Sequence, residues 1–64
     1  MTNLKRIRIE RGMTQAELAV KAGINPRTLQ DYEQAQKPIN TAAAMTVYKL
    51  AKALNVEIEK LLEI

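Results

Sequence analysis

The sequence predicts an all-α fold, a compact five-helix domain that occupies residues 1–64 as one unit. Helix-forming residues dominate the composition, Phe and Trp are absent, and no long segment alternates as a half-buried strand would. Only two Gly and two Pro are present, and they fall where helices should end or begin. Because the chain is short and has no Cys, its stability must come from helix packing rather than from disulfides.

The first helix is expected from about Asn3 to Arg11, with Thr2 or Asn3 as its N-cap. Gly12 follows it and can adopt the left-handed conformation that commonly ends a helix. Arg11 lies in the last turn, where the helix dipole favours a positive charge. These signals define one short helix at the start of the chain.

The second helix has the strongest local signal, a capping box over Thr14-Gln15-Ala16-Glu17. In this box the Thr14 hydroxyl accepts from the Glu17 amide, and the Glu17 carboxylate accepts from the Thr14 amide. Gly23 ends the helix after only about two turns. A second short helix is therefore expected between the box and this glycine.

The third helix begins almost at once. Asn25 is a favourable N-cap and Pro26 suits the first helical position, so the helix is expected to run to about Glu33 or Gln34. Two short helices joined only by Gly23-Ile24-Asn25 should cross at a steep angle, which is the helix-turn-helix. Where such a unit binds DNA, its second helix lies in the major groove.

Two more helices are expected after the loop over residues 34–39. Asn40 or Thr41 is predicted to cap a fourth helix that ends near Leu54, with Asn55 as its left-handed residue. A short fifth helix is expected over about residues 57–62. Its surroundings are more apolar than so short a helix needs, so this region predicts either a dimer surface or closure of the core. The residues concerned are the Leu54–Val56 corner, Ile58, Leu61, Leu62 and Ile64, with Ile64 the best exposed candidate.

Composition and charge limit the function classes. The net charge is +3, and residues 1–37 hold seven Lys/Arg against four Asp/Glu, which accounts for all of it (7 − 4 = +3). This bias indicates an anionic partner such as nucleic acid, although +3 is also an ordinary solubility charge. The absence of His, Cys, a metal-ligand cluster and a Gly-rich phosphate loop argues against an enzyme, a metal site or a cofactor. No apolar run approaches membrane-spanning length and the N-terminus is not a signal peptide, so a cytoplasmic location is expected.

A set of residues spread along most of the chain resembles the phage repressor and Cro (Xre-type) helix-turn-helix family. The resemblance is most specific between Thr14 and Glu33. It implies a sequence-specific DNA-binding regulator, of the repressor type, that binds near-palindromic operators as a homodimer. The residues that carry it are Arg8, Gly12, Thr14-Gln15-Ala16-Glu17-Leu18-Ala19, Gly23, Asn25, Thr28-Leu29, Tyr32-Glu33 and Leu50-Ala51-Lys52-Ala53-Leu54.

The resemblance also implies roles for individual residues. Arg8 and Glu33 match a structural ion pair that fixes the first helix on the third. Gln15 matches a phosphate contact at the start of the second helix. The residues expected to approach bases or phosphates on the third helix and the following loop are Asn25, Pro26, Arg27, Thr28, Gln30, Asp31, Lys37 and Asn40.

Arg27 is the best candidate for reading a base, because its guanidinium can bond guanine O6 and N7 together. A phosphate contact or a solvated side chain is the alternative for this residue. Asp31 could accept from cytosine N4, or it could pair with Arg27 one turn earlier; the pairing is favoured.

Two departures from the family pattern affect the loop after the third helix. Many relatives carry a Gly two residues after the Glu, whereas this chain has Ala35. Residues 41–45 are also expected to lengthen the fourth helix by about one turn.

A different function class stays open beside DNA binding, namely a helix-turn-helix protein-interaction module of the antitoxin or partner-binding kind, because fold alone does not decide function.

Overall fold

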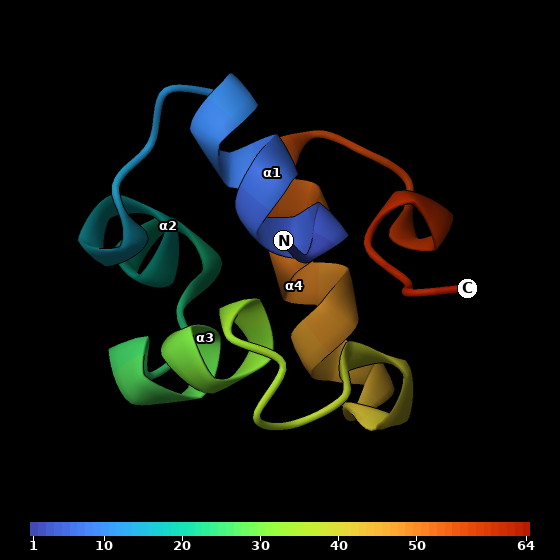
Figure 1. The fold of residues 1–64 in the computed structure, drawn as a ribbon. Coiled ribbons are helices and arrows are strands. Elements are labelled where there is room, and N and C mark those ends of the chain that lie inside the picture. The colour runs from blue at the N-terminus through green and yellow to red at the C-terminus, as the bar shows by residue number, and fades with distance from the viewer.

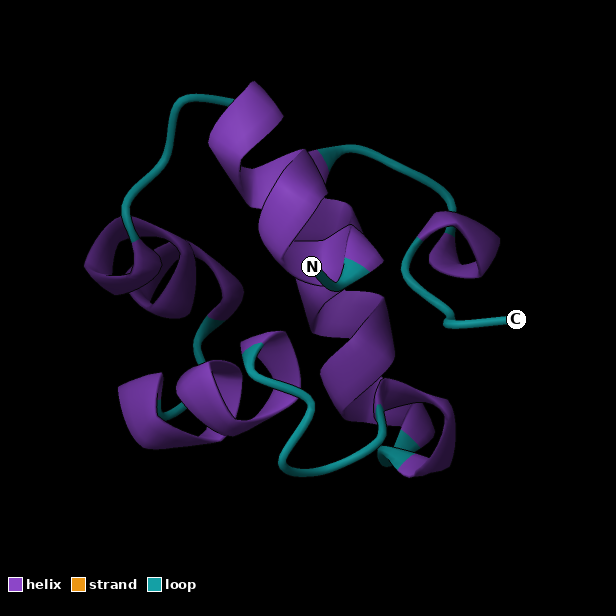
Figure 2. Cartoon of the chain, in the orientation of Figure 1, coloured by secondary structure: helices purple, strands orange, loops and turns teal.

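The computed structural model describes all residues 1–64 and contains helices but no strands (Figure 2). In Figure 1, α2 and α3 lie to one side of α1 and α4, and the C-terminal segment lies to the other. The all-α prediction is therefore confirmed. The elements in chain order are α1 (Asn3–Glu10), α2 (Gln15–Ala22), α3 (Pro26–Glu33), the 3₁₀ turn η1 (Ile39–Thr41), α4 (Ala44–Leu54) and the 3₁₀ turn η2 (Ile58–Lys60).

The predicted fifth α-helix is wrong, because residues 57–62 contain only the single turn η2. Glu57 precedes this turn and makes no side-chain cap, and so short a segment has no helical stability of its own. Its conformation is set instead by Leu61, whose side chain is fully buried in the core. The domain thus has four α-helices.

The start of the fourth helix was also predicted wrongly. Helix α4 begins at Ala44, and Ala42–Ala43 are extended, so the expected extra turn is absent. Neither expected cap is available. The Thr41 hydroxyl donates to a carbonyl three residues earlier, and the Asn40 side chain bonds the backbone of Glu63.

The N-caps of the first three helices are confirmed. The Thr2 hydroxyl accepts from the Lys5 amide at the start of α1. Both halves of the capping box at Thr14 and Glu17 are formed, at 2.8 and 3.1 Å. Asn25 Oδ1 accepts from the Arg27 amide at 2.8 Å and so caps α3.

The core is built mainly from leucines, one or more from every α-helix and one from the C-terminal segment. Ala19 is buried on α2, which packs against both α3 and α4, and its small side chain suits a close approach between helices. Ile24, in the turn between them, is half-buried and packs against the same core. The leucines that are fully buried are Leu4, Leu18, Leu29, Leu50, Leu54 and Leu61.

One buried ion pair connects α1 to α3. Arg8 Nε donates to Glu33 Oε2 at 2.6 Å, and Arg8 Nη2 donates to Glu33 Oε1 at 3.1 Å, which is a bidentate arrangement. The Glu33 side chain has 0% of its surface exposed. Arg8 Nη1 also donates to the Met13 carbonyl, and the Thr2 hydroxyl donates to the Glu33 carbonyl. The pair therefore ties the N-terminal segment, the α1–α2 loop and the end of α3 together.

Replacing Arg8 with methionine is expected to lower the free energy of unfolding by about 3 kcal/mol or more, because it leaves the Glu33 carboxylate buried without its main partner. Urea denaturation followed by circular dichroism measures this. The control is Arg6→Met, which removes the exposed partner of Glu10 (3.2 Å) and should cost about 0.5 kcal/mol or less. Equal unfolding midpoints for the two variants would show that the buried pair does not hold the fold together.

The left-handed positions predicted after α1, α2 and α4 are also confirmed, with φ values of +71° at Gly12, +71° at Gly23 and +58° at Asn55. Ala35 adopts the same conformation, with φ +59°. The loop after α3 thus takes a left-handed residue at a position that is not glycine, at the steric cost that an L-residue with a Cβ pays there.

Ala35→Gly is expected to raise the free energy of unfolding by about 0.5–1 kcal/mol, because it removes this strain. The matched control is Ala16→Gly on the exposed side of α2, which should lower stability by about 1 kcal/mol through lost helix propensity. The same substitution should therefore have opposite signs at the two positions in thermal or urea unfolding. A loss of stability at both would mean that the Ala35 conformation carries no strain.

Candidate nucleic-acid interface

The outward face of α3 holds most of the predicted contact residues. Leu29 and Glu33 point inward and are buried, which fixes the opposite side of the helix toward solvent. On that side the Arg27 side chain has 78% of its surface exposed. Asn25 and Pro26 are also exposed at the start of the helix. Thr28, Gln30 and Asp31 are half-buried along its flanks.

Asp31 lies between two cations. Arg27 Nε donates to Asp31 Oδ1 at 3.4 Å, and Lys37 Nζ lies 3.9 Å from Asp31 Oδ2. The structure therefore brings three of the predicted site residues together, from α3 and from the loop that follows it. The Asp31–Lys37 contact was not anticipated, because it depends on how the chain turns back after α3.

Gln15 is positioned by the same carboxylate that binds Arg8. Its Nε2 donates to Glu33 Oε1 at 3.0 Å, which holds the side chain at the N-terminus of α2 beside the end of α3. The amide nitrogen carries two hydrogens, so one remains to bond an anion. No local pattern in the sequence indicates this contact, because the two residues lie 18 positions apart.

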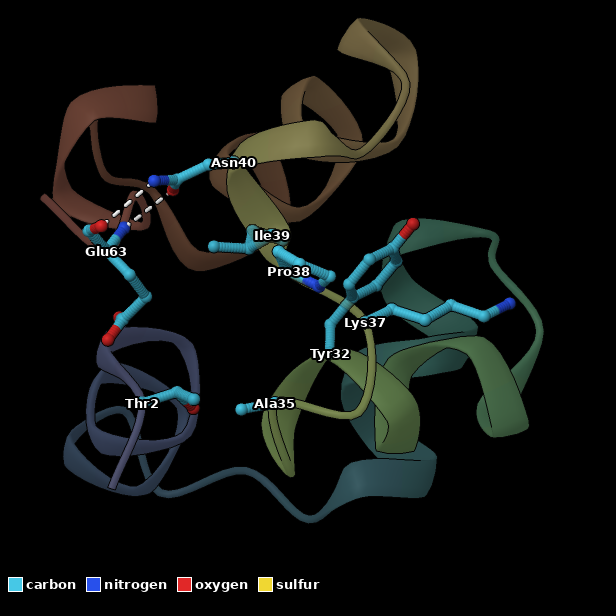
Figure 3. Close-up of a pocket in the computed structure, with 8 residues that line it drawn as sticks. All are labelled: Thr2, Tyr32, Ala35, Lys37, Pro38, Ile39, Asn40 and Glu63. Atoms are coloured by element: carbon cyan, nitrogen blue, oxygen red, sulfur yellow. Dashed lines mark hydrogen bonds between the residues drawn. The ribbon is translucent and has the colours of Figure 1, made fainter.

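The loop after α3, together with the C-terminal segment, borders a pocket of about 300 Å³. Figure 3 shows Lys37 beside the Tyr32 ring on one side of the pocket and Asn40 against Glu63 on the other. Lys37 and Asn40, the two loop residues predicted to contact phosphates, thus lie on different sides of this pocket. The lining residues are Thr2, Tyr32, Ala35, Lys37, Pro38, Ile39, Asn40 and Glu63.

Asn40 is occupied within the protein. Its Oδ1 accepts from the Glu63 amide at 2.8 Å, and its Nδ2 donates to the Glu63 carbonyl at 2.9 Å (Figure 3). This pairing anchors the C-terminal segment to η1. Asn40 stays a predicted phosphate contact, because its Nδ2 retains a second hydrogen beside the bond to Glu63.

A second group of cations lies on α2 and α4, away from the residues on the outward face of α3. Lys21, Lys49 and Lys52 surround a shallow groove of about 250 Å³ together with Tyr48, and no carboxylate lines it. Lys52 Nζ lies 6.0 Å from the centroid of the Tyr48 ring. We call Lys21, Lys49 and Lys52 the lysine cluster. The charge count along the sequence missed it, because its members come from the basic first part and the neutral second part of the chain.

The region expected to form a dimer surface is divided by the structure. Leu54 and Leu61 are in the core, so neither can contribute to such a surface. Ile58 is 39% exposed and Ile64 is 97% exposed. Only these two isoleucines, with the half-buried Val56 and Leu62 behind them, remain accessible to a second copy.

No three His, Cys, Asp or Glu side chains lie close enough to share a metal ion. None of the helices has the length and apolar character needed to cross a membrane. The outward side of α3 and the loop after it carry two cations, Arg27 and Lys37, beside the carboxylate of Asp31.

A family model described as helix-turn-helix matches residues 4–61, which include α2, α3 and the turn between them. The chain therefore belongs to the Xre/Cro-like helix-turn-helix family, a family of DNA-binding regulatory domains. This confirms the resemblance on which the sequence analysis relied. A search of curated proteins and a search of solved structures each found no match.

Proposed function

We propose that this domain recognises double-stranded DNA sequence-specifically and acts as a transcriptional regulator of the repressor type, with α3 in the major groove. The observation that carries the proposal is the position of Arg27. It is a 78% exposed cation in the first turn of α3, and the opposite side of that helix is held by the buried Glu33. A rigid helix that presents an arginine at its N-terminal end is suited to read base edges.

The other contacts divide into base readout and backbone positioning. Arg27 bonds guanine O6 and N7, with Thr28 and Pro26 close enough to meet a thymine methyl or a sugar. Gln15, at the positive end of α2, donates to a phosphate, and Lys37 neutralises another. Asn25, just before α3, and Gln30, near its middle, complete the proposed contact surface.

The domain binds as a homodimer on a near-palindromic operator, in this proposal. The two α3 helices would then enter successive major grooves about 34 Å apart. Support comes from the two exposed isoleucines of the C-terminal segment, Ile58 and Ile64, which give a second copy an apolar contact. That small area favours a dimer that forms on DNA rather than one that is stable in free solution.

Selection of binding sites from a randomised duplex library, at low and near-physiological salt, tests this function. An enriched palindrome supports the proposal, and its half-site spacing measures the dimer geometry. Binding without an enriched sequence, lost steeply as salt rises, would limit the domain to phosphate contacts. If no duplex bound at either salt, the protein-interaction alternative would replace DNA binding.

Arg27→Ala is expected to remove the preference for the base pair that Arg27 reads, which corresponds to about tenfold or more in affinity for the selected site. Folding should be unaffected, because the side chain is exposed. The control is Lys52→Ala, which removes the same charge from the lysine cluster and should leave the preference intact. Binding to the selected and the scrambled duplex is compared by fluorescence anisotropy, and unchanged affinity and preference in Arg27→Ala would exclude Arg27 as a base reader.

Lys37→Gln is expected to weaken binding to all duplexes alike and to reduce the salt slope of log K by about 1, as the loss of one phosphate contact should. Lys49→Gln, in the lysine cluster, should leave the slope unchanged. Titrations between low and physiological salt measure both slopes. The reverse result, with the slope reduced only in Lys49→Gln, would place the DNA on α2 and α4 instead of on α3.

A further inference from the structure

Asp31 is the only carboxylate on the outward face of α3. The other acid of this helix, Glu33, has no exposed side-chain surface, whereas the Asp31 side chain is 16% exposed. A negative charge beside DNA is repelled by the phosphates and by itself weakens binding. Asp31 lies between Arg27 and Lys37, so it also affects how these two cations can contact DNA.

The Asp31 carboxylate acts on Arg27 through one particular nitrogen. It accepts from Nε at 3.4 Å, which leaves Nη1 and Nη2 of Arg27 without a protein partner. These two terminal groups are a pair of donors that can bond guanine O6 and N7 together. Arg27 can therefore read guanine without giving up its contact with Asp31.

Lys37 is held differently. Its ammonium lies 3.9 Å from Asp31 Oδ2, and its backbone amide donates to the Asp31 carbonyl at 3.3 Å, beside the Gln36 amide at 2.9 Å. The Asp31 backbone carbonyl thus holds the loop in place, and the Asp31 carboxylate holds the Lys37 ammonium. A phosphate that binds the Lys37 ammonium has to compete with this carboxylate, whatever the DNA sequence.

We propose that Asp31 is a positioning residue that determines specificity: it orients Arg27 for guanine and lowers affinity for DNA of any other sequence. The inference rests on the proposed function. At the correct site, the oriented guanidinium makes its two base contacts and offsets the repulsion between Asp31 and the phosphates. At other sites, the repulsion and the retained Lys37 charge act without that compensation, so the ratio of specific to non-specific affinity increases.

The test compares Asp31→Asn with the wild-type domain on two duplexes, the site selected from the library and a scrambled sequence. Asp31→Asn should bind the scrambled duplex about three- to tenfold more tightly, because the carboxylate no longer repels the phosphates or competes with them for the Lys37 ammonium. Affinity for the selected site should stay the same or fall, because Arg27 is no longer oriented. The ratio of the two affinities should therefore fall by about tenfold, roughly the discrimination that one base contact provides.

Two variants separate this effect from a general change in charge. Glu10→Gln removes the carboxylate from a similar i, i+4 pair, with Arg6 at 3.2 Å on α1, and should leave the affinity ratio unchanged. Asp31→Glu keeps the charge and should keep most of the ratio. Circular dichroism before each titration shows that the variants are folded.

The outcomes that overturn the inference differ from those that overturn the function. If wild type prefers the selected site and Asp31→Asn keeps the same ratio as Glu10→Gln, Asp31 does not set specificity, while the DNA-binding function stands. If Asp31→Asn tightens binding to both duplexes equally, only general repulsion is present and the inference fails. If the wild type binds no duplex, the proposed function fails and the inference fails with it.

Discussion

The arrangement of the helices depends on satisfying one buried carboxylate. Glu33 has no exposed side-chain surface, and a charge in that position is tolerated only when donors replace the water it has lost. Two N–H groups of Arg8 and one of Gln15 supply those bonds. Because these donors belong to α1 and to the first residue of α2, the carboxylate is satisfied only when both helices are seated against the end of α3. A core of leucines alone would tolerate more than one such arrangement.

The same constraint determines which side of α3 is turned away from the core. Asp31 and Glu33 are two residues apart, so on a helix they point to nearly opposite sides. With Glu33 fixed inside, Asp31 has to face outward, and Arg27 lies one turn before it on the same side. The buried pair therefore fixes which acid of α3 is enclosed in the core and which lies beside Arg27 and Lys37. If α3 reads DNA as proposed, specificity and stability in this domain depend on the rotation of the same helix.

The sequence predicted those parts of the fold whose cause is local. The caps at Thr14 and Asn25 and the left-handed glycine at position 23 each depend on residues within one turn, and all three are present. The errors occur where distant residues compete for a side chain. Asn40 was expected to cap α4 but bonds Glu63, 23 positions later. Arg11 lies at the end of α1 as expected, but its Nε also donates to the Leu54 carbonyl at the end of α4, a contact that the sequence did not indicate.

In the candidate site too, features with a local cause could be predicted and contacts between distant residues could not. Residues on the outward face of α3 could be named in advance, because helical periodicity and two inward-facing residues, Leu29 and Glu33, orient that face. The contact between Asp31 and Lys37 could not, since it requires the chain to turn back at Ala35 in a left-handed conformation that its sequence does not favour. The contact between Lys37 and Asp31 therefore depends on the left-handed conformation of Ala35. A loop that turned elsewhere would leave Lys37 free of Asp31, and the carboxylate would then act on Arg27 alone.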